Sequence, residues 1–75
     1  MPKKIYITKT VYENFNNDEK GLYIMKTLGF SDIVKPKMLS SVGKVMTLKQ
    51  GARLQNIDIE VIKRVFKEYN YIVED

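Results

Sequence analysis

The stretch that decides the fold is DIEVIKRVFKEYN, residues 58–70. Asp58 is a good helix N-cap, because its carboxylate can accept hydrogen bonds from the first unpaired backbone N–H groups. Behind it, apolar residues recur every three or four positions while charged residues take the other side, which is the pattern of an amphipathic helix. The apolar stripe comprises Ile59, Ile62, Val65, Phe66 and Tyr69. The sequence therefore predicts a helix over residues 59–69 that Asn70 ends.

Similar start and stop signals upstream predict further short helices. Two capping-box pairs, Thr10 with Glu13 and Thr47 with Gln50, predict helices over residues 11–16 and 48–55. Between these two helices, the sequence predicts a third.

This third helix is expected to begin after Asn17 as its cap and to end at Gly29, since glycine readily adopts the left-handed conformation that closes a helix. Phe30 is expected to fold back onto its last turn. Ser31 can cap a short turn over residues 32–34.

Pro36 suits a first helical turn, and apolar spacing beyond it predicts a helix over residues 36–45, weakened by Gly43. The segments Ile5–Ile7 and Tyr71–Glu74 are rich in β-prone residues and are expected to pair as a ribbon covering the helices. The predicted fold is all-α: one domain over residues 1–75, an irregular array of about five short helices, with this small two-stranded ribbon joining the termini.

Composition limits the chemistry. The 75 residues include no cysteine and no histidine, so the side chains of most disulfide, zinc, iron–sulfur and imidazole-dependent sites are missing. Carboxylates are adjacent only at Asp18–Glu19 and Glu74–Asp75, a helix start and a chain end, where nothing would separate their pKa values. We expect no catalytic residue, no metal, no cofactor and no enzymatic activity.

Charge is unevenly distributed. The formal net charge is +4, but residues 35–67 alone carry eight basic and two acidic side chains. Such a surface is either simply solvated or attracts an acidic protein or phosphates. Tyrosines interleaved with basic residues keep nucleic-acid binding open as an alternative. The candidate basic residues are Lys37, Lys44, Lys49, Arg53, Lys63, Arg64 and Lys67.

The stretch SSVGK, residues 40–44, contains the residue types of a phosphate-binding loop. It lacks the earlier glycine and the Ser or Thr after the lysine, where Val45 stands, so that motif is rejected. A weaker anion-binding hypothesis remains, because the helix expected after Thr47 would offer free backbone N–H groups beside lysines. The candidate turn for an anion or small molecule consists of Gly43, Lys44, Thr47 and Gln50.

No secretory signal and no apolar run of membrane-spanning length is visible. We therefore expect a cytoplasmic protein that does not contact a membrane and that is a monomer or a small homo-oligomer.

The residues LGF (28–30) and the run VGKVMTLKQGA (42–52) resemble a small bacterial helical domain of unknown function. That domain is related to the redox disulfide domain associated with hybrid-cluster proteins and to the amino-terminal domain of ScdA-type iron–sulfur repair proteins. The resemblance runs from about Ile5 to Ile72. Its redox branch has a cysteine pair just after the Leu-Gly step, where this chain has SDIV (31–34), so thiol–disulfide exchange is impossible here.

What the resemblance implies is an array of about five helices with an accessory role beside redox or stress proteins. Together with the missing catalytic groups, it predicts a non-enzymatic cytoplasmic module that binds a protein partner through the basic residues of segment 35–67. A nucleic-acid-binding domain and a small-molecule or anion-binding domain are the alternatives.

Overall fold

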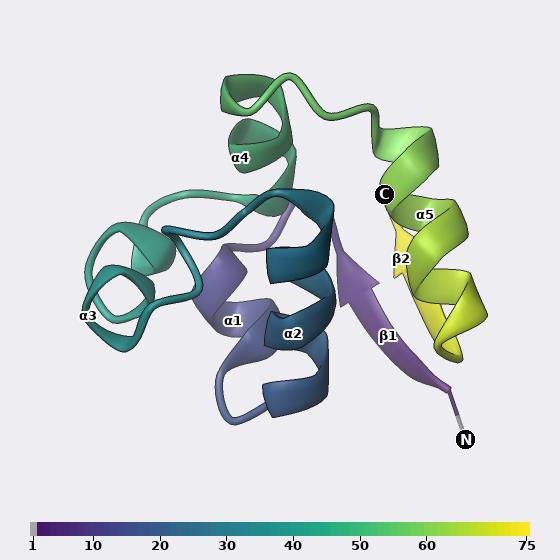
Figure 1. The fold of residues 1–75 in the computed structure, drawn as a ribbon, viewed down its shortest axis with the longest axis horizontal. Coiled ribbons are helices and arrows are strands. Elements are labelled where there is room, and N and C mark those ends of the chain that lie inside the picture. Colours follow the sequence, from purple (N-terminus) through teal and green to yellow (C-terminus); the bar gives the residue numbers. More distant parts are fainter. Residues whose placement is uncertain (1) are drawn as a thin grey trace.

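Residues 2–75, which the computed structural model describes, form five α-helices and one 3-10 helix between two short strands (Figure 1). The strands lie near the two ends of the chain. In chain order, the elements are β1 (Lys3–Tyr6), α1 (Val11–Phe15), α2 (Glu19–Leu28), α3 (Pro36–Leu39), η1 (Val42–Lys44), α4 (Leu48–Leu54), α5 (Ile59–Glu68) and β2 (Tyr71–Glu74).

The two strands pair in parallel, in a register that sets Lys3 opposite Tyr71 and Tyr6 opposite Glu74. The predicted pairing of the two terminal segments as a ribbon is thus confirmed. The fold is not cleanly all-α, however, but a helix-dominated domain that includes a two-stranded sheet. Such a short sheet is stable only when one face is covered, and here α5 packs against β2 (Figure 1).

The two predicted capping boxes are both present and begin α1 and α4 side by side. Thr10 and Thr47 each accept a hydrogen bond from the backbone N–H three residues on, and Glu13 and Gln50 bond back. The two caps also join each other, since the Val11 N–H donates to the Met46 carbonyl at 2.9 Å and the Leu48 N–H to the Lys9 carbonyl at 3.1 Å. A pair of local signals therefore fixes a contact between segments far apart in sequence.

The predicted cap of α2 is wrong by one residue. Asp18, not Asn17, caps the helix, because its carboxylate accepts a hydrogen bond from the Gly21 N–H at 3.0 Å. Asn17 lies in the preceding turn with a φ of 63°, a left-handed conformation that asparagine tolerates. The end of α2 is as predicted: Gly29 has a φ of 115°, and Phe30 folds back and is buried.

The helix predicted over residues 36–45 is interrupted. It divides into α3 and η1, because the Ser41 hydroxyl takes the Lys37 carbonyl, the Ser41 N–H donates to Met38 instead, and Ser41 leaves the helical conformation. Serine side chains compete in this way with the backbone bonds of a helix. The turn predicted at residues 32–34 is present and is closed by the Lys35 N–H, which donates to the Asp32 carbonyl.

The core lies between the sheet, α1, α2 and α5. Phe66 of α5 stacks on Phe15 of α1, with ring centroids 5.6 Å apart, and meets the edge of Tyr71 at 5.2 Å. The predicted stripe of α5 is correct for Ile62 and Phe66, which are fully buried, but Tyr69 at its end is exposed. Within residues 2–75, no helix has the length and apolar character needed to cross a lipid bilayer.

Candidate binding surface

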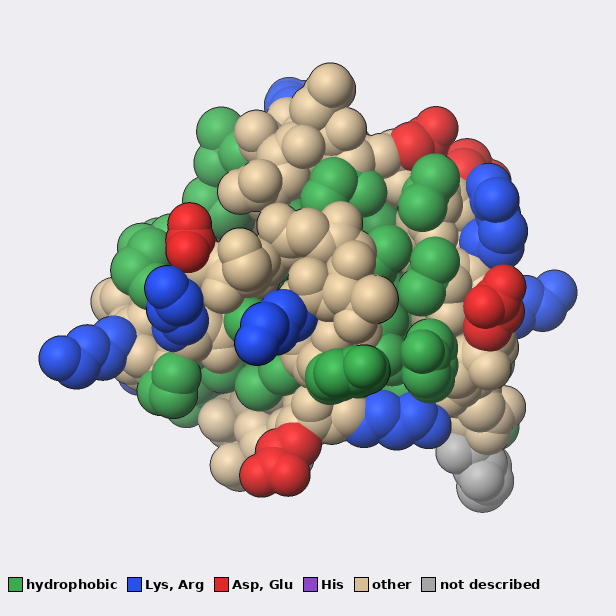
Figure 2. All heavy atoms as spheres, in the orientation of Figure 1, with side chains coloured by type: hydrophobic (Ala, Val, Ile, Leu, Met, Phe, Trp, Pro, Cys, Tyr) green, Lys and Arg blue, Asp and Glu red, His purple; other side chains and the backbone are tan. Residues whose placement is uncertain are grey.

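The seven basic residues predicted as one surface lie on separate parts of the molecule. Lys37, Lys44, Lys49 and Arg53 belong to α3, η1 and α4, whereas Lys63, Arg64 and Lys67 belong to α5. In Figure 1, α3 and α5 occupy opposite ends of the domain. Figure 2 accordingly shows basic side chains scattered over this face rather than gathered in one patch.

The surface around α5 is not basic once its neighbours are included. Residues 58–75 carry three basic and five acidic side chains. Lys63 lies between two of these carboxylates, with its Nζ 3.7 Å from Glu60 and 3.4 Å from Asp75. The α5 group therefore offers little net attraction for an acidic partner.

The other group lies in a stretch with no opposing charge. Residues 33–57 contain five basic side chains and no Asp or Glu. Two of the five are engaged: Lys35 lies 3.5 Å from the Asp32 carboxylate, and the Lys44 ammonium lies 4.9 Å from the centre of the Tyr12 ring. We call the surface formed by residues 36–54 the α3–α4 surface.

An apolar groove opens on the α3–α4 surface. Its inner part, about 200 Å³, has Phe30 and Gly51 among its lining residues together with two methionines, Met38 and Met46. An adjoining depression of about 360 Å³ shares Met46 and Leu54 with it. The complete lining of the two parts is Val11, Phe30, Asp32, Ile33, Met38, Val42, Val45, Met46, Gln50, Gly51, Arg53, Leu54 and Gln55.

Apolar side chains at the groove are exposed to an unusual degree. Val45 is 78% exposed and Leu54 is 71% exposed, while Met38 and Met46 are half-buried. The sequence did not reveal this site, because methionine and leucine at helical spacing are typical of a buried core and nothing local marks them as exposed. We call these two adjoining depressions the Met46 groove.

The candidate anion-binding turn does not have the free donors that were expected of it. The Leu48 and Lys49 N–H groups donate to the Lys9 and Ile7 carbonyls, and the Gln50 N–H donates to the Thr47 hydroxyl. Gly43, another member of the turn, is buried beneath Leu39. An anion at this turn would have to replace existing hydrogen bonds, so the site stays a prediction.

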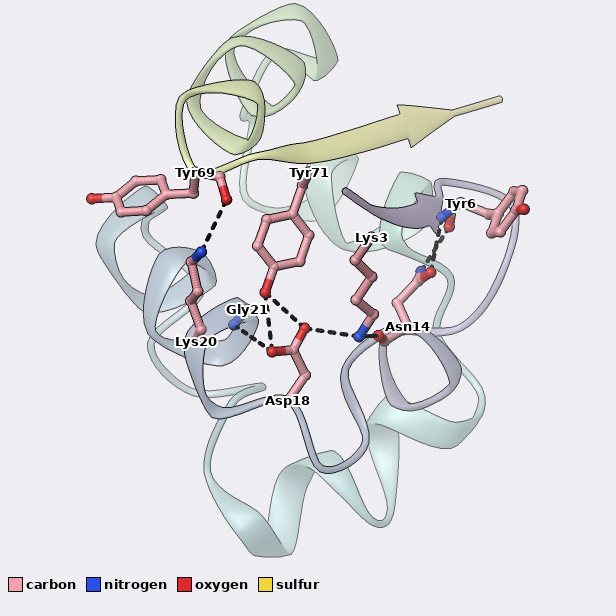
Figure 3. Close-up of polar contacts among 8 residues, drawn as sticks. All are labelled: Lys3, Tyr6, Asn14, Asp18, Lys20, Gly21, Tyr69 and Tyr71. Atoms are coloured by element: carbon pink, nitrogen blue, oxygen red, sulfur yellow. Dashed lines mark hydrogen bonds and ion pairs between the residues drawn. The ribbon is translucent and has the colours of Figure 1, made fainter. Parts of the chain in front are cut away.

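A polar cluster joins the two strands to α2 (Figure 3). The Asp18 carboxylate accepts hydrogen bonds from Lys3 Nζ at 2.8 Å, from the Gly21 N–H at 3.0 Å and from the Tyr71 hydroxyl at 2.9 Å. We call these four residues the Asp18 clasp. They come from β1, α2 and β2 and from the turn before α2, so one carboxylate ties both ends of the chain to the helices.

The clasp moves the pKa values of its members away from neutrality. Burial alone would raise the pKa of Asp18, but the hydrogen bonds from Lys3, Gly21 and Tyr71 outweigh it and lower that pKa below its usual value. Burial, together with the adjacent Asp18 carboxylate, raises the pKa of Tyr71 to about 12. At neutral pH, Asp18 is ionised and Tyr71 is protonated, as suits a structural contact.

Asn14 closes the edge of β1 beside the clasp. Its side-chain amide donates to the Tyr6 carbonyl at 2.7 Å and accepts from the Tyr6 N–H at 2.8 Å, as a neighbouring strand would (Figure 3). Asn14 is 5% exposed, and Lys3 Nζ in turn donates to its backbone carbonyl. The edge of the sheet at Tyr6 is therefore already paired within the chain.

Parallel strands from the two ends of the chain, packed with short capped helices, define a small helix-dominated domain of mixed α and β structure. The chain belongs to the family described as Domain of unknown function (DUF1858), whose model matches residues 5–63. No protein of curated function matches it significantly.

The fold is similar to that in the crystal structure of the conserved domain protein from Streptococcus pneumoniae TIGR4. The TM-score is 0.89, with 30% sequence identity over 97% of this chain and 92% of that chain. The resemblance to a small domain of unknown function is thus confirmed. The narrower relation to redox disulfide and ScdA-type domains stays a prediction.

Proposed function

We propose that the chain is a non-enzymatic cytoplasmic module that docks on a partner protein through the α3–α4 surface. One observation carries the proposal: two large apolar side chains, Val45 and Leu54, stand exposed beside a groove in a stretch of five positive and no negative charges. Exposed apolar groups rimmed by charge are typical of protein–protein contact sites.

The absence of enzymatic activity is proposed from the chemistry of the titratable groups. The chain contains no histidine and no cysteine. In the Asp18 clasp, the pKa of the partly buried Asp18 carboxyl is lowered and the pKa of the Tyr71 hydroxyl is raised, both further from neutrality, so neither group exchanges protons near pH 7. An accessory role beside redox or stress proteins is part of the proposal and rests on the resemblance alone.

Site-specific photo-crosslinking in cells that naturally express the chain tests the proposal. A photoreactive amino acid replaces Leu54 in one variant and Ile72, which is exposed on β2, in a matched control. We expect one protein to be crosslinked from position 54 and not from position 72. That protein is then purified and titrated against the unmodified chain.

Charge-reversal variants provide a second test of the docking site. Lys49→Glu with Arg53→Glu should weaken the reconstituted complex at least tenfold, whereas Arg64→Glu with Lys67→Glu on α5 should leave it nearly unchanged. Equal crosslinking from positions 54 and 72 would show that the α3–α4 surface is not the docking site. An equal loss of affinity in the two double charge-reversal variants would show the same.

Nucleic-acid binding remains the second candidate, since the α3–α4 surface is positively charged. Three tyrosine rings are already covered by ammonium groups, Tyr6 by Lys9, Tyr12 by Lys44 and Tyr71 by Lys20, which leaves less aromatic surface for stacked bases. Titration of labelled DNA and RNA at two ionic strengths distinguishes nucleic-acid binding from docking on a protein. Tight binding that falls steeply with salt would favour this candidate over the protein partner.

A further inference from the structure

We propose that the Met46 groove receives an acidic segment of a partner protein, with one large apolar side chain of that segment seated against Gly51. The inference rests on the proposed function and names the partner's chemistry. Three features support it: a glycine that the fold does not require, an adaptable lining of methionines, and a one-sided charge.

Gly51 lies in the middle of α4, where glycine weakens a helix relative to alanine. Its backbone is not in the left-handed region. A Cβ built there would lie 3.5 Å from Met46 Sδ and 3.5 Å from Phe30 Cε1, which is ordinary van der Waals contact. The isolated domain therefore has room for alanine, and what the missing Cβ provides is an open groove in front of Phe30 and Met46.

The size and lining of the inner part of the Met46 groove, the part that Gly51 lines, suit a single side chain. The inner part measures about 200 Å³, below the ~300–1,000 Å³ of most small-molecule pockets. Met38 and Met46 are half-buried at its sides. Methionine is flexible and polarisable, so it adapts to apolar groups of different shape and is common on peptide-binding surfaces.

Charge selects an acidic partner. Arg53 lines the outer part of the groove, and Lys37 and Lys49 are exposed on the flanking helices. One carboxylate, that of Asp32, lines the inner part, and it is paired with Lys35. Residues 33–57 thus leave a positive excess around an apolar slot. Complementary charge speeds association and excludes basic competitors.

The test uses three synthetic peptide pools. In the first pool, a central Leu, Phe or Met is flanked by Asp, Glu, Ser and Ala; in the second, Lys and Arg replace the acidic residues; in the third, Ser replaces the central residue. Binding is followed by NMR on protein labelled at the methionine methyl groups. We expect only the first pool to shift the Met38 and Met46 signals, while Met25, which is fully buried in the core, stays unchanged.

Two variants link the binding to the proposed contacts. Gly51→Ala should raise the melting temperature, because alanine favours the helix, and should weaken the best acidic peptide about tenfold by filling the slot. Arg53→Glu should weaken it similarly, whereas Arg64→Glu, a matched reversal on α5, should not. Retained affinity in Gly51→Ala, or equal binding of the basic pool, would overturn the proposal.

Other outcomes separate this inference from the proposed function. A protein crosslinked from position 54, combined with no response to any acidic pool, would leave the docking surface standing and remove the acidic occupant. Met38 and Met46 shifts that change with protein concentration alone would instead identify a second copy of the chain as the occupant, and would equally overturn the inference.

Discussion

The Asp18 clasp and the Met46 groove differ in how completely their side chains find partners within the chain. At the clasp, the carboxylate of Asp18 is bonded by groups from both strands and α2, and Phe15, Phe66 and Tyr71 pack beside it. At the groove, Val45 and Leu54 remain in solvent. The difference indicates that one region holds the fold together while the other is available for contact, so substitutions should affect stability and binding separately.

The strongest test of this division is Phe66→Ala. Phe66 is fully buried and touches two aromatic rings, and its truncation should lower the free energy of unfolding by about 3–5 kcal/mol. A core of this size rarely supplies more than that. We expect the variant to lose its cooperative thermal transition in circular dichroism.

Two controls accompany that measurement. Phe66→Leu restores much of the volume and should recover the transition at a lower temperature. Met46→Ala, in the half-buried lining of the groove, should keep it. If Met46→Ala lost as much stability as Phe66→Ala, the distinction between the two regions would be contradicted.

Tyr71→Phe removes one donor from the clasp while keeping the ring in the core. Hydrogen bonds to charged groups are worth about 1.5–3 kcal/mol. We expect the lower end of that range, since Lys3 and the Gly21 N–H still hold the Asp18 carboxylate. Urea denaturation measures the change, and Tyr23→Phe, at an exposed tyrosine, is the control. Equal stabilities of Tyr71→Phe and the unmodified chain would mean that the hydroxyl contributes nothing.

The glycines of the two regions should respond to alanine with opposite signs. At Gly21, a Cβ would lie 2.5 Å from Asp18 Oδ2 and 2.6 Å from Phe15 Cδ1. Overpacking of this kind costs about 1–3 kcal/mol, more than the helix gains, so Gly21→Ala should destabilise. Gly51→Ala should stabilise by at most about 1 kcal/mol. Urea midpoints that moved in the same direction would show that close packing does not distinguish the two sites.

Part of the loss of folding stability at low pH should come from the Asp18 clasp. The pKa of Asp18 is lower in the folded chain than its ordinary value of 3.8, so the unfolded chain binds the proton more readily. The stabilisation is complete above about pH 5 and is lost as the pH falls through 4 towards the folded-state pKa.

Asp18→Asn should remove this part of the acid dependence, because asparagine does not titrate yet still caps a helix well. The measurement is the free energy of unfolding from pH 7 down to 3. Asp32→Asn, at an exposed carboxylate of the turn before α3, is the matched control. Parallel stability curves for Asp18→Asn and the unmodified chain would contradict the role of the clasp.

Sequence reasoning succeeded where the decisive contacts are local. Thr10 with Glu13, Thr47 with Gln50, and Gly29 act within one turn, and each placed a helix end correctly. It failed at residues 36–45, where the bond from the Ser41 hydroxyl to the Lys37 carbonyl replaces a helical backbone bond that the apolar spacing had predicted. The parallel direction of the strands and the separation of the basic residues onto α3–α4 and α5 depend on how the helices pack, which no short stretch encodes. The groove was missed for the same reason.

The smallest expected effect on stability is at Leu54. Its side chain is 71% exposed, so Leu54→Ser should change the free energy of unfolding by no more than about 0.5 kcal/mol, as is usual for surface positions. The same change should abolish photo-crosslinking of a partner from a reactive group at Val45 and weaken the acidic peptides. Leu48→Ser, at a fully buried position six residues earlier in α4, should instead unfold the domain. If Leu54→Ser proved as destabilising as Leu48→Ser, this leucine would belong to the core, and the exposure on which the docking surface depends would be wrong.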